Sequence, residues 1–274
     1  MRVNRKNHPR PELLAEGPNQ VWSWDITKLM GPVKWSYFYL YVLLDIFSRY
    51  VVGWRIENME SGALAKILIE ESIQSQNIAK DELSIHSDRG APMTSKAVTQ
   101  LLADLGVIKS LSRPHVSNDN PFSEAHFSTL KSCPTYPDRF GSIQDARGWG
   151  QTFFSWYNTE HKHSGIGYYT PEMVHYGKAH EFYNLRSQTL LRAYETHPER
   201  FVNKIPKPHD VPQKVWINPP AQIGGTQGME QIPKIDLNAN MTIFFKQILP
   251  KGGEIKRTGT DSSLIDLQQV SHFY

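Results

Sequence analysis

Residues 35–57, WSYFYLYVLLDIFSRYVVGWRIE, place the strongest constraint on the fold. The segment holds two runs rich in Tyr, Val, Leu and Phe, which favour β-strands. The residues between them, DIFSR at 45–49, are typical of a hairpin connection. Strands that are this continuously apolar occur in sheets covered on both faces. The sequence therefore predicts a hairpin inside a sheet that lies between two layers.

The segments around this hairpin predict the rest of a mixed sheet. A partly alternating run precedes it, and amphipathic helices alternate with short strands after it. The expected strands are 20–29, 82–88 and 107–112, and the expected helices are 61–76, 94–106 and one beginning at 122, with a further helix at 143–158. Three antiparallel strands followed by alternating helices and strands predict an α/β fold with a five-stranded mixed sheet flanked by helices.

Composition limits the class of protein. The chain has 274 residues, of which 39% are apolar and 21% charged, so it can bury a sizeable core and is not globally disordered. The formal charge of +3 is only a weak pointer to a polyanionic partner. Cys133 is the single cysteine, which excludes a disulfide framework and a thiolate zinc site. No apolar run has the length of a membrane span, and we expect a cytoplasmic protein.

We divide the chain into four parts from its composition. Residues 1–18 form a basic arm, residues 19–178 the core, and residues 179–220 an irregular C-terminal extension. The tail at 221–274 is atypical, and read-through past a damaged stop codon would explain it.

Three carboxylates stand at informative places in this scheme. Asp25 lies inside the first predicted strand, Asp88 ends the fourth, and Glu124 lies in the first turns of the helix that follows the fifth. The topology makes the first and fourth strands neighbours, and the helix can cross their ends, so the three acids would converge. Clustered carboxylates repel one another and need a cation. Oxygen ligands without cysteine favour Mg²⁺ or Mn²⁺, and two such ions can clamp an in-line phosphoryl transfer.

Five stretches, in order along the chain, carry a resemblance to a known family. They read WSWDITKL, LLDIFSRYVVGW, HSDRG, SRPHVSNDNPFSEAHFSTLK and YNTEHKHSGIGYYTPEMV. With thirty-five residues between Asp88 and Glu124, they resemble the catalytic core of the DDE transposases of bacterial insertion sequences. More narrowly, they are similar to the second-frame, integrase-core subunit of the insertion-sequence-three family. The resemblance covers residues 19–178 and extends less securely to residue 220.

The resemblance implies an RNase H-like fold and retroviral-integrase-like chemistry. The expected activity is metal-dependent cleavage of DNA at the 3′ ends of an insertion sequence, followed by strand transfer to target DNA. Carried over by position, Asp25, Asp88 and Glu124 are the catalytic, metal-binding triad, with two Mg²⁺ or Mn²⁺ ions. Lys131 falls seven residues after Glu124 on the same helical face and is expected to bind DNA phosphate.

Other residues of the matching stretches are candidate DNA contacts. They are Arg89, Arg113, His115, Asn120 and His163. The expected partners are the element's terminal repeats and target DNA, together with a second copy of the chain in a homodimer or higher oligomer. Bound to DNA, the protein would lie in the bacterial nucleoid. Only the basic arm, with Arg2, Arg5, Lys6 and Arg10, precedes the core, so a first-frame helix-turn-helix partner or a fusion is expected to read the element's ends.

Several residues near these candidates are assigned structural roles. Asp45 is expected to hold the hairpin connection together with Ser48, and Asp119 and Asn120 are expected to cap the Glu124 helix. Four tryptophans are assigned to the core. They are Trp22, Trp24, Trp35 and Trp54.

Two other functions are kept as alternatives to the transposase. One is a catalytically silent, DNA-binding remnant of a transposon. The other keeps the fold but makes the protein a structure-specific nuclease of the RNase H type, which would cleave RNA–DNA hybrids without joining DNA.

Overall fold

The computed structural model describes residues 9–114, 116–202 and 204–220. The chain divides into units at 1–237 and 238–274, and the second unit lies wholly outside the described residues. The predicted tail at 221–274 therefore also lies outside them.

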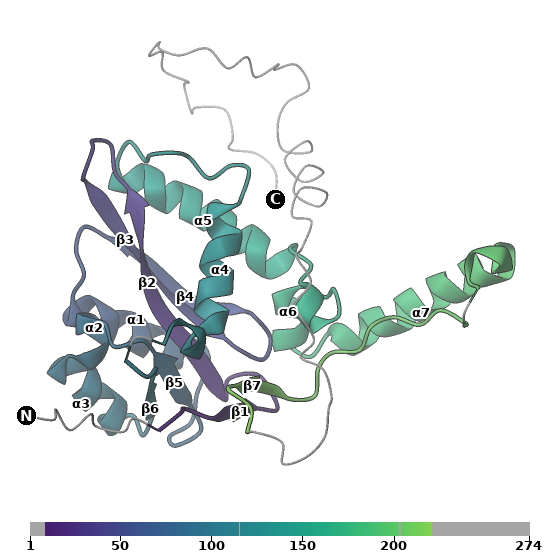
Figure 1. Ribbon diagram of the computed structural model, residues 1–274, viewed down its shortest axis with the longest axis horizontal. Coiled ribbons are helices and arrows are strands. Elements are labelled where there is room, and N and C mark those ends of the chain that lie inside the picture. Colours follow the sequence, from purple (N-terminus) through teal and green to yellow (C-terminus); the bar gives the residue numbers. More distant parts are fainter. Residues whose placement is uncertain (1–8, 115, 203, 221–274) are drawn as a thin grey trace, which may run out of the picture. The chain divides into compact units, whose positions relative to one another are not determined.

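A five-stranded mixed sheet forms the centre of the protein (Figure 1). Its order is β4-β3-β2-β5-β6, in which β2, β3 and β4 are antiparallel and β5 and β6 run parallel to β2. The strands are β2 (Val21–Met30), β3 (Tyr37–Asp45), β4 (Val51–Glu57), β5 (Ser84–Ser87) and β6 (Ile108–Leu111). This confirms the predicted α/β class and the RNase H-like arrangement of the sheet.

Helices cover both faces of the sheet (Figure 1). On one face, α1 packs on β3 and β4 and α3 packs on β6; on the other, α4 packs on β2 and β3 and α5 on β4. The helices are α1 (Gly62–Ser75), α2 (Ala91–Thr94), α3 (Lys96–Asp104), α4 (Pro121–Lys131), α5 (Ile143–Thr159), α6 (Pro171–His175) and α7 (Ala179–Thr196), with 3-10 turns η1 (Ser117–Asp119), η2 (Ser164–Ile166) and η3 (Pro198–Arg200). The layered sheet predicted from residues 35–57 is thus confirmed.

The helix expected at 94–106 is α3, which ends just before Gly106 as predicted, and the short helix α2 precedes it. Ser95 separates them, because its extended backbone ends α2 while its hydroxyl accepts the Val98 N–H and caps α3. Gly106 follows α3 with a left-handed φ of 68°, a conformation that glycine adopts without strain.

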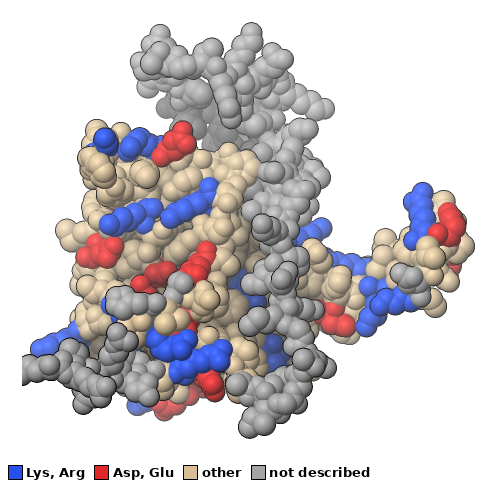
Figure 2. Space-filling model, in the orientation of Figure 1, with Lys and Arg blue, Asp and Glu red and all other residues tan. Residues whose placement is uncertain are grey.

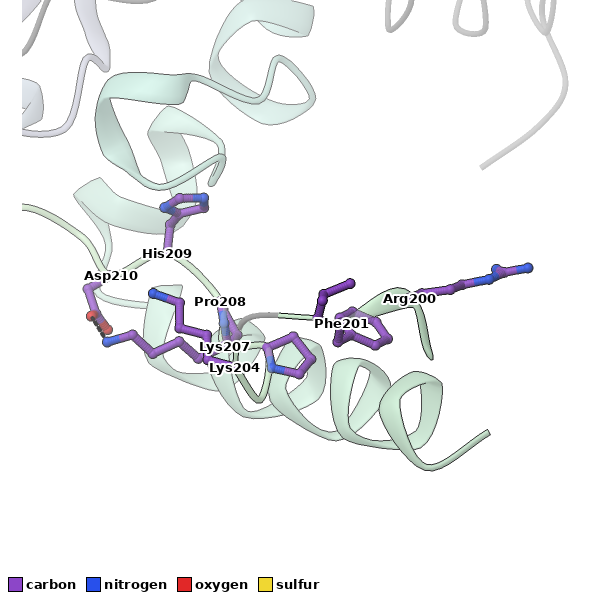
Figure 3. Close-up of a pocket in the computed structure, with 9 residues that line it drawn as sticks. Arg200, Phe201, Lys204, Lys207, Pro208, His209 and Asp210 are labelled. Atoms are coloured by element: carbon purple, nitrogen blue, oxygen red, sulfur yellow. Dashed lines mark ion pairs between the residues drawn. The ribbon is translucent and has the colours of Figure 1, made fainter. Parts of the chain in front are cut away.

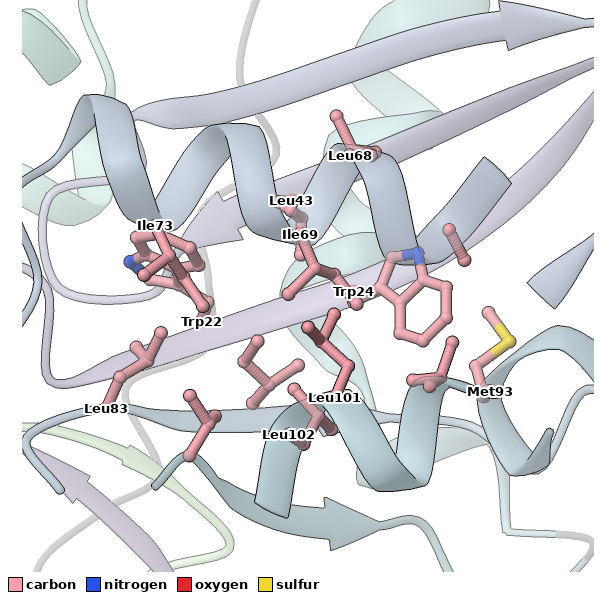
Figure 4. Packing of buried hydrophobic residues seen from close by; sticks show 14 of the residues in the cluster. Trp22, Trp24, Leu43, Leu68, Ile69, Ile73, Leu83, Met93, Leu101 and Leu102 are labelled. Carbon is pink, nitrogen blue, oxygen red and sulfur yellow. The ribbon is translucent and has the colours of Figure 1, made fainter. Parts of the chain in front are cut away.

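The main core lies between the sheet and the α1–α3 layer (Figure 4). Trp22 and Trp24 of β2 are fully buried against the apolar faces of α1 and α3, where Ile69 and Leu101 are also buried. Side chains alternate along a strand, so Ser23, which lies between these tryptophans, faces the opposite, α4 side. Two of the four tryptophans assigned to the core are therefore confirmed there.

The other two tryptophans behave differently. Trp54 is partly buried and stacks on Phe154 of α5 with ring centroids 4.7 Å apart. Trp35 is 76% exposed in the turn between β2 and β3, so its assignment to the core was wrong. Gly31 and Pro32, just before it, are the sequence signal that the chain turns here.

A second small sheet ties the two ends of the described chain together. β1 (Leu13–Ala15) pairs antiparallel with β7 (Val215–Ile217), and Ala15 and Ile217 are fully buried. The segment expected to be an arm thus contains a strand. The segment expected to be an irregular extension contains the 18-residue helix α7, in which Ala179 is the buried residue. Among the described residues, no helix is long and apolar enough to cross a membrane.

Candidate active site

Strand register brings two of the three predicted carboxylates together. β2 and β5 are parallel, and their last paired rung joins Trp24 to Ser87. Asp25 and Asp88 follow these residues directly, so they lie side by side where β5 ends, at the spacing of neighbouring strands, about 4.8 Å. Asp25 Oδ1 accepts the Ile26 N–H at 2.8 Å, and Asp88 Oδ1 accepts the Gly90 N–H at 2.8 Å.

The third carboxylate comes from the first turn of α4. Glu124 and both aspartates line one hollow of about 750 Å³ on the α4 side of the sheet. Arg89, Arg113 and Asn120 line the same hollow. The structure therefore places in one hollow three acids that are 99 residues apart from first to last in the sequence.

A buried polar layer fixes the three elements beneath these carboxylates. Ser23 lies two residues before Asp25 on the same face of β2, and its hydroxyl is 2.5 Å from Asn120 Oδ1 and 2.6 Å from Ser123 Oγ, both at the start of α4. His86, two residues before Asp88, has Nε2 2.8 Å from the Asp119 carbonyl oxygen. These contacts set where α4 begins relative to β2 and β5.

The Asn120 side chain belongs to this layer rather than to a helix cap. Asn120 occupies the N-cap position of α4, but its amide donates to the Trp24 carbonyl and its oxygen accepts from Ser23. Asn120 thus stands at the N-cap of α4, as predicted, but its side chain makes no capping hydrogen bond, and the Asp119 carboxylate bonds to Arg113 instead. Hydrogen bonds between the Asn120 side chain and β2 replace the local bond to an α4 backbone N–H that the sequence suggests.

Asp119, which is buried, forms an ion pair with the partly exposed Arg113. Its carboxylate accepts the Nε and Nη2 hydrogens of the guanidinium at 2.9 Å each, as well as the Arg113 backbone N–H. Asn218, just after β7, donates to the same carboxylate at 2.9 Å. The hydrogen bonds from Arg113 hold the pKa of Asp119 well below its ordinary value. The loop before α4 is thus tied to the C-terminal segment.

Burial controls the electrostatics of the carboxylates themselves. The pKa of Asp25 is raised from 3.8 to about 7, chiefly by burial, against the lowering effect of the Ile26 N–H and with smaller contributions from the charges of Asp88 and Glu124. Partial burial also raises the pKa of Glu124, whereas burial lowers the pKa of His86. Asp25 is therefore the member of the group whose ionisation most needs a neighbouring cation.

The donor set suits a hard divalent ion. The three side chains offer only carboxylate oxygens, which Mg²⁺ and Mn²⁺ prefer, and a cation among them would relieve the repulsion acting on Asp25. Within the described residues, no three His, Cys, Asp or Glu side chains are already spaced as a finished metal site. The chemistry of the donors fits these ions, and closing round an ion requires Asp88 and Glu124, both exposed, to turn inward.

The predicted DNA contacts fall into three groups. Arg89 lines the hollow, where its Nε donates to the Ser112 carbonyl, and Lys131 lies beyond it on α4, with Nζ donating to Thr27 Oγ1 at 2.8 Å. Arg113 and Asn120 line the hollow but are engaged in the bonds described above. His163 is outside the lining, where its Nδ1 accepts the Gly165 N–H in η2. His115 lies outside the described residues.

Asp45 has the structural role expected of it. Its fully buried carboxylate accepts the backbone N–H and hydroxyl of Ser48 and the N–H of Asn19. Sequence reasoning did not find Ser23, Ser123 or Asn218 as residues that organise the site. A polar residue in the apolar first half of β2, two places before Asp25, is the signal that could have pointed to Ser23.

Acidic and basic side chains occupy different parts of the surface around the hollow. Acidic side chains gather near the middle of this face, and Lys and Arg side chains lie on both sides of them (Figure 2). The cations that the structure describes here include Arg89 and Arg113 beside the hollow and Lys131 farther along α4. A polyanion could thus bridge the acidic centre and touch cations on either side.

A second hollow lies in the segment between α7 and β7 (Figure 3). Arg200, Lys204 and Lys207 line it, and Lys207 pairs with Asp210 at 3.8 Å. It contains none of the predicted catalytic residues and no group of carboxylates, so it is not the candidate active site.

Family models match most of the folded part of the chain. Two models, each described as an integrase core domain, match residues 15–117 and 105–171. A transposase of insertion sequence element IS904 from Lactococcus lactis is 30% identical over 172 residues, covering 60% of this chain and 66% of that protein. The transposase InsF of IS3A from Escherichia coli is 29% identical over 165 residues, covering 59% and 55%.

More distant similarities extend this set. The transposase of IS629 from Shigella sonnei is 26% identical and covers 62% of this chain and 54% of its own length. The chain thus spans between 54% and 66% of the length of these curated relatives. Among solved structures, the simian T-cell lymphotropic virus intasome gives a TM-score of 0.48 at 18% identity, covering 63% of this chain and 60% of that one. The HTLV-2 integrase catalytic core in complex with magnesium gives 0.43 at 16%, covering 58% and 97%.

Proposed function

Because the chain belongs to the integrase-core family, we propose that it is the catalytic subunit of an insertion-sequence transposase, which cleaves DNA at the element's 3′ ends and transfers them to target DNA. The observation that carries the proposal is the convergence of Asp25, Asp88 and Glu124 in one hollow. The names of the curated relatives, all transposases of insertion sequences, support the same activity.

We assign Asp25, Asp88 and Glu124 as the groups that hold divalent ions, Mg²⁺ or Mn²⁺. Bound there, a pair of such ions would activate the attacking hydroxyl and stabilise charge on the leaving 3′ oxygen. The chain's own contribution is position, because the layer of Ser23, His86 and the start of α4 holds three separate elements in register. Asp25 contributes its charge only when its proton is lost, and a bound ion would favour that loss near neutral pH, where its raised pKa otherwise leaves it partly protonated.

The proposed reaction consists of two phosphoryl transfers at the same site. In the first, water attacks the phosphorus at the element's end, the bond to the 3′ oxygen breaks, and a 3′-hydroxyl is left. In the second, that hydroxyl attacks a target phosphodiester, a new 3′ O–P bond forms, and the target's own 3′ oxygen leaves with a proton. Lys131, held beside Thr27 within reach of the hollow, is suited to binding a phosphate that flanks the reacting one.

The partners that follow from this function are DNA and further copies of the chain. Two element ends must be held together, so we expect a dimer or higher oligomer. Reading the terminal repeats would fall to a first-frame helix-turn-helix partner or a fused domain, as expected from the sequence.

A strand-transfer assay tests the proposal. The substrate is a labelled, pre-cut duplex whose sequence comes from the DNA flanking the gene, with Mg²⁺ in the buffer. Wild-type protein should join the labelled strand to target DNA, and Glu124→Gln should not, although it folds normally. Glu181→Gln is the matched control, because Glu181 is also an exposed glutamate in the first turn of a helix, α7, and should retain joining.

Three outcomes would contradict parts of the proposal. Joining by Glu124→Gln at the wild-type rate would remove Glu124 from the site. DNA binding without joining by the wild type, with an end-binding domain supplied, would indicate a silent remnant. Cleavage of RNA–DNA hybrids without any joining would indicate an RNase H-type nuclease.

A further inference from the structure

The turn between β2 and β3 holds an exposed tryptophan in a strained conformation. Trp35 is 76% exposed, and its φ of 69° lies in the left-handed region, which bulky residues rarely adopt. The turn is nevertheless firmly braced. The Gly31 N–H donates to the Ser36 carbonyl at 2.9 Å, and Arg139 Nη1 donates to the carbonyls of Gly31 and Val33 at 3.0 Å each. A rigid turn that keeps an indole strained and in solvent is typical of a binding residue.

Positive charge accompanies this indole. Lys34 Nζ lies 5.3 Å from the centre of the Trp35 ring, and Lys28 Nζ lies 5.3 Å and 5.9 Å from the rings of Tyr37 and Tyr39. In the part of the chain that the structure describes, neither lysine forms an ion pair with a carboxylate. Exposed cations beside an exposed indole and partly buried tyrosine rings match the chemistry of a nucleic acid, which offers phosphates and flat bases.

The turn is continuous with the candidate active site along β2. β5 pairs with β2 only as far as Trp24, so the strand from Asp25 to Met30 runs beyond the end of β5. Lys131, bonded to Thr27, lies on this path. At about 3.3 Å per residue, the turn is about 20 Å from Asp25. Successive phosphates of one strand advance about 3.4 Å along a duplex, so this distance corresponds to about six base pairs.

We propose that the β2–β3 turn is a second point of contact with duplex DNA, about six base pairs from the phosphate that reacts. Trp35 packs against the sugar or base edge, and Lys34 binds an adjoining phosphate. The inference rests on the proposed function, because a duplex reaches the turn only if its reacting phosphate lies in the hollow of the three carboxylates.

The variant Trp35→Gly tests the contact because it should weaken DNA binding without lowering the stability of the fold. Glycine adopts the left-handed conformation without strain, so the thermal midpoint should stay the same or rise. The dissociation constant for a duplex with the element's terminal sequence should nevertheless increase about five- to tenfold, through loss of the indole. Damage to the fold would instead lower stability and affinity together.

A matched control separates strain relief from loss of the ring. Asn77, which follows α1, also has a left-handed backbone, with a φ of 51°, and it lines a different hollow together with Gln20, just before β2. Asn77→Gly makes the same kind of backbone change without changing charge and should leave DNA affinity unaltered. Hydroxyl-radical footprinting then locates the effect, because Trp35→Gly should lose protection only about six base pairs from the joined phosphate.

The outcomes distinguish this inference from the proposed function. Wild-type protein that neither binds the duplex nor joins its ends would overturn both. Wild-type protein that binds and joins, with affinity and footprint unchanged in Trp35→Gly, would overturn only the contact at the turn. An altered oligomeric state in Trp35→Gly with unchanged DNA affinity would assign the turn to contact between copies and would also overturn it.

Discussion

Replacing Asp25 with asparagine should stabilise the metal-free protein, and only above a defined pH. In the folded protein the pKa of Asp25 is about 7, whereas the ordinary value is 3.8. Burial is the main cause, followed by the charges of Asp88 and Glu124. Asparagine keeps an oxygen that can accept the Ile26 N–H but carries no charge, so the substitution removes the electrostatic penalty with little change in packing.

The sign and size of the effect follow from proton linkage. Between about pH 4 and pH 7 the unfolded chain has lost the Asp25 proton and the folded protein still holds it. The free energy of unfolding of the wild type therefore falls as the pH rises through this range and stays low above it. A difference of about three pKa units corresponds to at most about 4 kcal/mol. At pH 8 Asp25→Asn should gain stability up to this amount, and at pH 4 it should gain almost none.

Urea denaturation at pH 4 and pH 8, with and without Mg²⁺, is the assay. A cation that binds only the folded protein stabilises it in proportion to the logarithm of its concentration relative to Kd. Mg²⁺ should therefore raise the midpoint of the wild type at pH 8 and have little effect on Asp25→Asn. Asp138→Asn, at an exposed aspartate, is the matched control and should behave as the wild type does in all four conditions.

Two results would refute this reasoning. Equal midpoints for wild type and Asp25→Asn in metal-free buffer at pH 8 would show that Asp25 is not held in an unfavourable environment. An equal Mg²⁺ shift in both proteins would show that the ion binds somewhere other than Asp25.

Three further predictions concern groups around the site. Arg113→Ala leaves Asp119 buried without the guanidinium that pairs with it, so the urea midpoint at pH 7 should fall. Because the pKa of Asp119 is depressed in the folded protein, the difference from wild type should shrink as the pH falls through the acid range. A loss of stability that does not change with pH would contradict the ion pair. Asn218→Ala should lower the same midpoint less, since Asp119 keeps both guanidinium bonds, and a loss equal to that of Arg113→Ala would argue otherwise. Lys131→Gln, which can still donate to Thr27, should leave the midpoint unchanged and reduce by about one the slope of log affinity against log salt in a DNA titration.

The central sheet could be predicted from the sequence because its signals are local. The apolar runs of β3 and β4 and the alternation in β2 are set by which residues suit a buried strand. Ser61 precedes α1 and caps it through the Ala63 N–H, which is a bond between near neighbours in the chain. The carboxylates of the site could be predicted for a related reason. Asp25 and Asp88 lie in or beside apolar strands, where burying a charge is unfavourable unless it is paired or binds a cation.

Elements that are stabilised by residues distant in the chain could not be predicted in the same way. β1 and β7 each have three residues and depend on one another across about 200 residues, so neither carries a pattern of its own. Helix α7 buries little of its surface, so it shows only a weak apolar face for periodicity to detect. Trp35 was assigned to the core because aromatic residues are usually buried, whereas the braced turn keeps it in solvent.

The sequence by itself determined the strands and helices of the sheet, the three acids and their order along the chain. The tertiary structure decided how the acids meet, since the register of β2 with β5 sets Asp25 beside Asp88. It also decided that the Asn120 side chain bonds to Ser23 and Trp24 of β2 instead of to a backbone N–H at the start of α4. The physical reason is that local propensities depend on neighbours in the chain, whereas burial, pKa and hydrogen-bond partners depend on residues brought close only by folding.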